Sequence, residues 1–434
     1  MSNRTALFGT DGIRGKYGVD VTSDTAYLLG NSIGTRTRER IIVGRDTRPS
    51  GAVLRDALVK GIIDAGGDVL DLGIVSTPLV AYAVSHSNSD YGVVVTASHN
   101  SAEYNGLKVF ESSGMKIDRD TERAIEEDMN GGINISSVLG ELTCDNAYTD
   151  EYINMLKDEF LGISGLNVAV DTGNGALSHI GSEVVGSILK GSIIINNEGD
   201  GTRINDMSGA LHPEHLRDIV IGGGLDIGFA YDGDGDRITA VTHTGSIVNG
   251  DMMLYALAMY MKSHDILTNN VVVGTPYTNI GLEKALERHG ISLIRADVGD
   301  SNVAIAMREA HASLGGERAG HIILSRYGMT GDALLVSLVL CRIVEESGES
   351  LESLTSYEEY PVFSRDIVSQ NSAKVCDMYA NIIDKARRIV HDEGRVIVRP
   401  SGTEPKIRVM VECKDELLGE NTLDYIVSEI ERHL

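Results

Sequence analysis

Residues 93–100 read Val-Val-Val-Thr-Ala-Ser-His-Asn, an apolar run that turns polar within one residue. Three consecutive β-branched residues predict a short strand that is buried on both of its faces. The polar residues that follow stand at the carboxyl end of this strand, where ligands bind in open α/β sheets. On this stretch alone Ser98 has two interpretations: it caps a following helix, or it meets a ligand.

The pattern of strand, polar turn, helix and strand at residues 41–72 returns at 167–196 and at 271–294. Each copy has a Val/Ile-rich strand, a glycine-bearing turn, a helix and a second strand, which together make a βαβ unit. The spacing of the three copies is that of whole domains rather than of solenoid repeats. We therefore expect three related α/β domains, each a mixed sheet flanked by helices.

The pattern changes from residue 357 onward. Strands are predicted at 362–368, 395–399 and 407–412, with a helix over 372–391 and a second helix from about 421. Strands on both sides of a helix indicate a smaller α+β domain. The predicted domains are 1–150, 151–250, 251–356 and 357–434. Since no long linker separates them, we expect them to pack together and to leave clefts.

The composition narrows the class of partner and the compartment. A formal net charge of −25 over 434 residues argues against nucleic acid as the main partner. The sequence has no apolar run long enough to span a membrane and no signal-peptide core at its start, so we expect a cytoplasmic protein without a membrane partner. The four cysteines stand far apart, which favours reduced thiols over a structural zinc site.

The most informative polar motif is Asp-Gly-Asp-Gly-Asp-Arg at residues 232–237, after a strand at 227–230. Three carboxylates spaced by glycine suit a hard cation, Mg²⁺ or Ca²⁺. An EF-hand loop does not fit, because Arg237 stands at its sixth position and His243 at its twelfth. A solvated acidic turn remains as the alternative, although its carboxylates would repel each other without a cation.

A second motif, residues 398–408, predicts an anion site in the last domain. Its Ser-Gly-Thr offers hydroxyls and backbone N–H groups, and the arginines at 399 and 408 could fork onto phosphate oxygens. A plain turn is the alternative. If Ser98 were phosphorylated, it would supply the oxygen ligand that three carboxylates leave open in a Mg²⁺ shell.

Two shorter glycine-framed motifs carry polar side chains. Residues 9–15 predict a tight loop that presents Arg14, either to a ligand or to solvent. Residues 315–321 place Glu317 and His321 on a turn before an apolar strand, where they could bind hydroxyls, transfer protons or be merely structural.

Taken in order, residues 9–15, 96–100, 232–237, 316–321 and 399–408 resemble the motifs of the α-D-phosphohexomutases across all four domains. The resemblance implies a heart-shaped four-domain enzyme that interconverts hexose 6-phosphates and 1-phosphates. It implies a phosphoserine, a 1,6-bisphosphosugar intermediate that also serves as activator, and one Mg²⁺ per active site. The implied substrate is a phosphorylated hexose or hexosamine, and the implied assembly is a monomer or homodimer.

The resemblance also implies a role for each motif residue. Ser98 would carry the phosphoryl group, with His99 supporting its loop. The metal ligands would be Ser98, Asp232, Asp234 and Asp236. The catalytic residues would be Ser98, Lys108, Arg14, His321 and Arg237. The substrate-binding residues would be Glu317, Arg399, Ser401, Gly402, Thr403 and Arg408.

The sequence departs from the family pattern at two positions. Ser101 replaces a proline, which loosens the serine loop, and Ala319 replaces a serine that would contact the sugar. The stretches 9–15, 298–300 and 330–332 are most similar to the phosphoglucosamine mutase branch, including its archaeal members, which favours glucosamine 6-phosphate as substrate. The alternatives are phosphomannomutase or phosphoglucomutase activity, a sugar-phosphate-binding protein without activity, and a Mg²⁺-dependent phosphatase with an aspartyl nucleophile.

Overall fold

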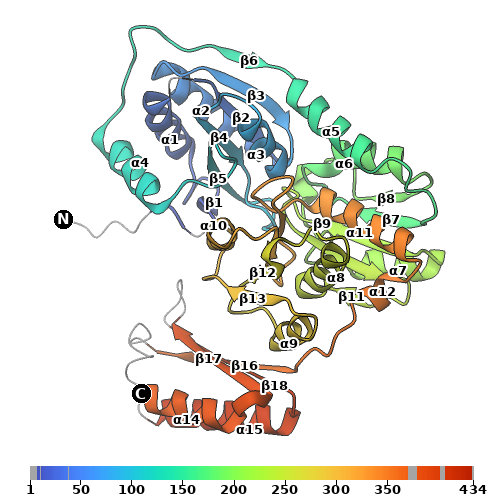
Figure 1. Cartoon of the computed structure of the whole chain (residues 1–434). Helices are drawn as coiled ribbons and strands as arrows, with labels where there is room; N and C mark the ends of the chain where they lie inside the picture. Colours follow the sequence, from blue (N-terminus) through green and yellow to red (C-terminus); the bar gives the residue numbers. More distant parts are fainter. Residues whose placement is uncertain (1–6, 10, 38, 370–378, 401–405, 433–434) are drawn as a thin grey trace. The chain divides into compact units, whose positions relative to one another are not determined.

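The computed structural model describes residues 7–9, 11–37, 39–369, 379–400 and 406–432. The chain forms two compact units, Met1–Tyr277 with Ile291–Ser356 and Thr278–Gly290 with Tyr357–Leu434. Three sheets with their helices belong to the first unit, and one belongs to the second (Figure 1). Of the helices that the structure describes, none combines the length and the apolar character needed to cross a membrane.

The first sheet has six strands in the order β1-β5-β4-β2-β3-β6. Strands β2, β3, β4 and β6 run parallel, and β5 between β4 and β1 is antiparallel to both of these neighbours. The bounds are β1 Ile13–Lys16, β2 Ile41–Arg45, β3 Val69–Ile74, β4 Tyr91–Val95, β5 Tyr104–Glu111 and β6 Leu142–Cys144. Its helices are α1 Ser23–Arg36, α2 Gly51–Asp64, α3 Thr77–Ser85 and α4 Arg119–Gly131, and α5 Ala147–Glu159 follows β6.

Strand β4 is buried on both faces, as the Val93–Val95 run predicts. All three valines have no exposed surface. Val93 and Val95 join the core formed with α1, α2 and α4, and Val94 points to the opposite face because side chains alternate along a strand. The strand is therefore held rigidly, and so is the start of the polar segment that follows it.

The second and third sheets are also mixed. The second has the order β11-β10-β9-β7-β8 and the third the order β13-β12-β14-β15. The second comprises β7 Val168–Asp171, β8 Ile193–Ile195, β9 Ile227–Tyr231, β10 Ile238–Thr242 and β11 Ile247–Val248, with α6 Leu177–Ile188 and α7 Glu214–Gly223. The third comprises β12 Val271–Gly274, β13 Ser292–Arg295, β14 Leu314–Gly316 and β15 Ile322–Leu324, with α8 Gly250–Ser263 and α10 Asp300–Ala310. Helix α11 Ala333–Ser347 follows β15 and packs on β9 and β10 of the second sheet, and α12 Leu351–Leu354 comes after it.

One connection recurs in all three mixed sheets. A strand of the parallel part (β4, β9 or β14) runs into a polar loop, and the chain then returns as an antiparallel neighbour (β5, β10 or β15). These loops span residues 96–103, 232–237 and 317–321. The prediction of three related α/β domains is confirmed in this respect, and each sheet presents its polar motif at the same topological position.

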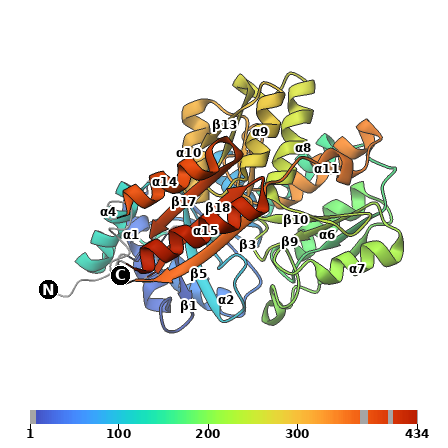
Figure 2. The ribbon, with the colours of Figure 1, turned by 90° about the horizontal axis from the view of Figure 1, so that it is seen from below.

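The second unit holds a smaller α+β fold. Its sheet is fully antiparallel in the order β16-β18-β17, with β16 Val362–Val368, β17 Gly394–Pro400 and β18 Lys406–Cys413. Helices α14 Ala380–Val390 and α15 Glu416–Glu431 share a core with this sheet, and Figure 2 shows both lying along it. Helix α9 Ile280–Arg288 also belongs to this unit.

Several element boundaries differ from those predicted. Helix α1 ends at Arg36, because Thr37 takes an extended conformation. The last helix begins at Glu416 rather than near 421, since the Asp415 side chain caps it by accepting from Leu418 N. Arg14 lies on strand β1 and not on a loop, because residues 13–16 pair with β5. The predicted boundaries at residues 150, 250 and 356 stay a prediction.

Candidate active site

Ser98 lies in the loop between β4 and β5, and its interpretation as a helix cap is wrong. Residues 96–103 form turns that lead directly into β5. The Ser98 backbone is left-handed, with φ +50°, and its N–H donates to Thr96 Oγ1 at 2.9 Å. The buried hydroxyl donates to Asp232 Oδ2 at 2.6 Å. The structure thus joins the serine of the first sheet to the aspartate loop of the second.

The three aspartates of the 232–237 loop converge at this serine. They are buried, and they offer carboxylate oxygens that lie within 4.8 Å of one another. Gly235 allows the loop to curl, because its backbone has φ +73°. Gly233 allows the loop to approach Ser98 closely, because a Cβ at this position would lie 2.6 Å from Ser98 O. This clustering suits a hard cation, as the sequence predicts.

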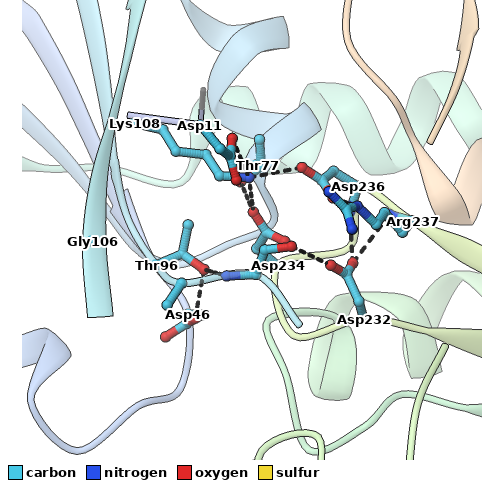
Figure 3. Close-up of polar contacts among 12 residues, drawn as sticks. Asp11, Asp46, Thr77, Thr96, Gly106, Lys108, Asp232, Asp234, Asp236 and Arg237 are labelled. Carbon is cyan, nitrogen blue, oxygen red and sulfur yellow. Dashed lines mark hydrogen bonds and ion pairs between the residues drawn. The ribbon is translucent and has the colours of Figure 1, made fainter. Parts of the chain in front are cut away.

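Lys108 reaches the same carboxylates from β5 (Figure 3). Its Nζ donates to Asp234 Oδ2 and to Asp236 Oδ2, both at 2.8 Å, and Thr77 Oγ1 adds a 2.6 Å bond to Asp234. Burial alone would lower the pKa of Lys108, yet neighbouring carboxylates, led by Asp11, raise it well above its usual value. Lys108 is therefore a fixed positive charge beside the aspartate cluster.

Arg14, His99 and Arg237 lie around the serine loop. Arg14 donates from β1 to the carbonyl of Ala97. The His99 Nδ1 atom lies 3.3 Å from Ser98 Oγ and 3.1 Å from an Arg237 nitrogen. Burial and the charges of the two arginines lower the pKa of His99 to about 4, so the ring is neutral at neutral pH. This geometry agrees with a supporting role for His99 on the loop.

His321 is fully buried at the start of β15 and bridges two carboxylates. Its Nδ1 lies 3.8 Å from Asp236 Oδ2, and its Nε2 lies 3.8 Å from Asp300 Oδ2. Burial lowers the pKa of His321, but Asp236 and Asp300 raise it above the usual value. Against this, Gly331 N–H donates to Nε2 at 2.9 Å, and this bond requires a ring whose proton sits on Nδ1. The hydrogen bond from Gly331 therefore assigns His321 as a neutral ring with Nδ1–H toward Asp236.

Glu317 and the predicted phosphate loop complete the set of predicted residues. Glu317 is half-buried in the turn whose backbone bonds to His321 O, and Ala319 in the same turn is exposed. In the second unit, Arg399 on β17 pairs in register with Arg408 on β18. Residues Ser401, Gly402 and Thr403 lie outside the described residues.

Two sets of charged residues, one buried and one half-buried, were not predicted from the sequence. Arg48, paired with Asp46 at 2.9 Å, lies under the serine loop. Lys116 bonds to both Asp11 and Asp300, next to Lys108 and His321. The polar turn at 44–51 follows strand β2, the sheet neighbour of β4, so the position of Arg48 could have been inferred from strand order. The Lys116 contacts depend on tertiary packing alone.

A serine joined to a buried carboxylate cluster, with lysine, arginine and histidine around it on mixed α/β sheets, fits a phosphoryl-transfer enzyme. The family models agree with this class. Phosphoglucomutase/phosphomannomutase alpha/beta/alpha domains I, II and III match residues 5–134, 148–245 and 249–360, and the C-terminal domain matches 364–428. The chain therefore belongs to the phosphoglucomutase/phosphomannomutase family of phosphohexomutases.

Two named proteins are similar to this chain over nearly its whole length. The chain is 38% identical over 443 residues to a phosphoglucosamine mutase of Oceanobacillus iheyensis, covering 99% of both chains, and 39% identical over 427 residues to one of Clostridium tetani, covering 94% of this chain and 95% of that protein. Among solved structures, a phosphoglucomutase/phosphomannomutase family protein of Burkholderia thailandensis matches with a TM-score of 0.83 at 24% identity, over 98% of this chain and 97% of that one. The fold is thus the four-domain phosphohexomutase fold, and the chain is a mutase of hexose or hexosamine phosphates.

Proposed function

We propose that this enzyme interconverts glucosamine 6-phosphate and glucosamine 1-phosphate through a phosphoryl group carried on Ser98. The hydrogen bond of 2.6 Å from Ser98 Oγ to Asp232 Oδ2 carries this proposal, because it places a nucleophilic oxygen at the edge of a carboxylate cluster. The choice of sugar is supported by full-length relatives, named phosphoglucosamine mutases, at 36–39% identity.

The aspartate cluster fits one Mg²⁺ ion, held by Asp232, Asp234 and Asp236 with an oxygen of phosphorylated Ser98. The Oδ1 atoms of Asp234 and Asp236 are buried and make no hydrogen bond among the described residues. Burial, and then the two neighbouring aspartates, raise the pKa of Asp232 well above its usual value, a strain that a bound cation would relieve. When bound, the ion would draw negative charge from the phosphoryl group during transfer. A structure of the Aspergillus fumigatus N-acetylphosphoglucosamine mutase is described with GlcNAc-6P and magnesium.

The transfer step exchanges one phosphoester bond for another. A sugar hydroxyl oxygen, at C1 or C6, forms a bond to phosphorus as the bond from phosphorus to Ser98 Oγ breaks. The proton of the sugar hydroxyl passes to Ser98 Oγ, and the serine hydroxyl formed in this way donates a hydrogen bond to Asp232. In the return step Ser98 Oγ forms a bond to the other phosphorus of the sugar 1,6-bisphosphate, the bond from that phosphorus to the sugar oxygen breaks, and the Ser98 proton passes to that sugar oxygen. The same bisphosphate would activate an unphosphorylated enzyme.

The remaining predicted residues are assigned around this step. Lys108 places a permanent positive charge next to the cluster, and His321, whose ring touches Asp236, is the candidate for proton transfer. Arg14 and Arg237 flank the serine loop, and Glu317 would bind sugar hydroxyls.

A phosphate site in the second unit is supported by Arg399 and Arg408. These residues face each other on adjacent strands, an arrangement of like charges that is unfavourable unless other groups offset it. A phosphate group bound by the two arginines would contribute to this balance. Together with Ser401, Gly402 and Thr403 they would bind the phosphate that does not react.

Intact-mass measurement of the purified protein tests the carrier. We expect a fraction with one added phosphate, which the Ser98→Ala variant lacks, and we expect that variant to lose mutase turnover even with bisphosphosugar supplied. A Ser98→Ala variant with normal turnover would exclude the phosphoserine route.

The competing assignment is phosphomannomutase or phosphoglucomutase activity, which the family description names. Parallel assays on glucosamine, glucose and mannose 6-phosphates distinguish the two. We expect kcat/KM for glucosamine 6-phosphate to exceed the others at least about tenfold, a difference of roughly 1.4 kcal/mol in transition-state binding. Equal values on all three sugars would contradict the glucosamine assignment.

We also propose a cytoplasmic location and a monomeric or homodimeric state. The free thiols of Cys144, Cys341 and Cys413 support a reducing compartment. Light scattering of the purified protein measures its mass, and a mass above that of two chains would contradict the proposed state.

A further inference from the structure

Arg48 is a fully buried arginine that no motif of the reaction includes. It lies in the polar turn after β2, the strand that is hydrogen-bonded to β4 in the first sheet. Its Nε donates to Asp46 Oδ2 at 2.9 Å. A buried guanidinium offers five donors in a rigid fork, so the remaining donors must find acceptors nearby.

Those acceptors are backbone carbonyls of the serine loop. One terminal nitrogen of Arg48 donates to Ser98 O at 2.8 Å and to Asn100 O at 2.7 Å. The other donates to Tyr104 O at 3.0 Å and also to Ser101 O. One side chain therefore holds four carbonyls of a seven-residue segment, from Ser98 to Tyr104.

Asn205 lies between β8 and α7, in the domain of the second sheet, and donates to two of the same carbonyls. Its Nδ2 lies 2.9 Å from Ser98 O and 3.0 Å from Asn100 O. The carbonyl of Ser98 thus receives one hydrogen bond from Arg48 and one from Asn205. Together the two side chains use both lone pairs of that oxygen and fix its direction.

A third contact holds the start of the loop. Asp46, the partner of Arg48, accepts from Thr96 Oγ1 at 2.7 Å, and Thr96 Oγ1 in turn accepts from Ser98 N. Figure 3 shows the Asp46–Thr96 contact beside the aspartate cluster. The Ser98 backbone is consequently held at both of its polar groups: the N–H through Thr96 and Asp46, and the C=O by Arg48 and Asn205.

These hydrogen bonds account for an unfavourable backbone conformation of Ser98. Ser98 has φ +50°, a region that non-glycine residues other than Asn and Asp seldom occupy. From this backbone, the Ser98 hydroxyl meets Asp232 at 2.6 Å. If the carbonyl rotated back, the hydroxyl would leave the carboxylate cluster.

We propose that Arg48 and Asn205 are positioning residues, which hold the Ser98 backbone in the left-handed conformation that aims Oγ at the aspartate loop. This inference rests on the proposed role of Ser98 as phosphoryl carrier. Because both residues act on the backbone carbonyl, they keep the loop in place whether Ser98 carries a hydroxyl or a phosphoester. Neither needs to touch the sugar.

The first test is Arg48→Lys, which keeps a positive charge near Asp46 but loses the fork. Ser98 is phosphorylated with glucose 1,6-bisphosphate in a quenched-flow experiment and followed by intact mass. We expect the maximal rate of phosphate uptake to fall about 30- to 100-fold, the order expected from an ångström-scale displacement of a reacting group. The bisphosphate concentration at half-maximal rate should stay within about threefold, since the sugar contacts are intact.

The second test is Asn205→Gly, which keeps the left-handed backbone of Asn205 (φ +58°) accessible and removes the side chain with its amide. We expect roughly a tenfold lower rate of uptake. The matched control is Asn31→Ala: Asn31 is also buried and also donates to two carbonyls, those of Gly61 and Asn134. This control should take up phosphate at the wild-type rate.

The outcomes separate the inference from the function beneath it. If wild-type protein takes up no phosphate on Ser98, the proposed function fails first. If the wild type is phosphorylated and the folded Arg48→Lys or Asn205→Gly variants match its rate, the positioning role is wrong. Should Arg48→Lys fail to fold, Asn205→Gly decides; a rate loss that Asn31→Ala shares would also overturn the proposal, because it would then reflect general destabilisation.

Discussion

Replacing Lys108 by methionine should leave two buried carboxylates without their hydrogen-bonded cation. Lys108 is 2% exposed, and its Nζ bonds Asp234 and Asp236 at 2.8 Å each. Methionine fills a similar volume, so the main loss is electrostatic rather than a cavity. Removing one partner of a buried ion pair costs about 3–5 kcal/mol, and we expect a loss of this order in metal-free protein.

The same substitution should make the protein's stability depend more strongly on Mg²⁺. A cation that binds the folded state stabilises it according to its concentration and affinity, and the carboxylates of Asp234 and Asp236 are no longer neutralised by lysine. We expect Mg²⁺ to recover most of the lost free energy of unfolding in the variant. In wild-type protein the stabilisation by Mg²⁺ should be smaller.

Urea unfolding followed by circular dichroism, in EDTA and in saturating Mg²⁺, measures both effects. The matched control is Lys60→Met, which removes a lysine whose pair with Asp64 is 2.6 Å long but whose side chain is 67% exposed. That variant should change stability by no more than about 0.5 kcal/mol, with or without the ion. A Lys108→Met protein that unfolds at the wild-type urea midpoint in EDTA, or equal stabilisation of the two proteins by Mg²⁺, would contradict this prediction.

Three further predictions concern a buried carboxyl group, two glycines and the metal ion. Burial raises the pKa of Asp332 from 3.8 to about 6. The folded state therefore holds an extra proton between these two pH values, and the free energy of unfolding should fall by about 3 kcal/mol as the pH rises through this range. Asp332→Asn should abolish this fall, measured as the difference between the urea midpoints around pH 4 and around pH 7. Gly233→Ala would place a Cβ 2.6 Å from Ser98 O and should lower kcat at least about tenfold by displacing the loop, while Gly186→Ala, in an open position of α6, should raise the unfolding free energy by about 0.5–1 kcal/mol. EDTA should reduce turnover to background and Mg²⁺ should restore it, whereas turnover that survives exhaustive chelation would contradict the assignment of the aspartate loop.

Local sequence patterns predicted much of the fold. The Val93–Val95 run gives a strand because its β-branched side chains are buried on both sides of a sheet, and the glycines of 232–237 give a curled loop because alternation with aspartate leaves little else possible. The pattern failed for Arg14, whose strand β1 exists by pairing with β5 some 90 residues later in the chain. Such a pairing depends on tertiary structure, which a window of neighbouring residues does not contain.

Some residues of the candidate site could be predicted from local sequence motifs, and others could not. Residue type within a glycine-bearing motif was enough to predict Ser98, the three aspartates and His321, and the structure brings these residues together. Arg48 carries no such signal, because its partners are backbone carbonyls that any residue could supply. Its role follows from the adjacency of β2 and β4 in the sheet.

The convergence of the site follows from one connection used three times. In each mixed sheet a parallel strand ends in a short polar loop and the chain returns antiparallel, so the loop projects from the same edge of its sheet. Within the first unit these loops meet: Ser98 of the first bonds Asp232 of the second at 2.6 Å, and Asp236 of the second lies 3.8 Å from His321 of the third. The proposed phosphoryl carrier, the proposed cation ligands and the proposed proton-transfer residue thus occupy equivalent positions in three copies of one architecture. Because each copy would contribute a different chemistry, we expect the reaction to depend on how the three loops are aligned with one another. Substitutions at contacts that cross between copies, such as Asn205 to Ser98 O, should therefore impair catalysis without touching the sugar.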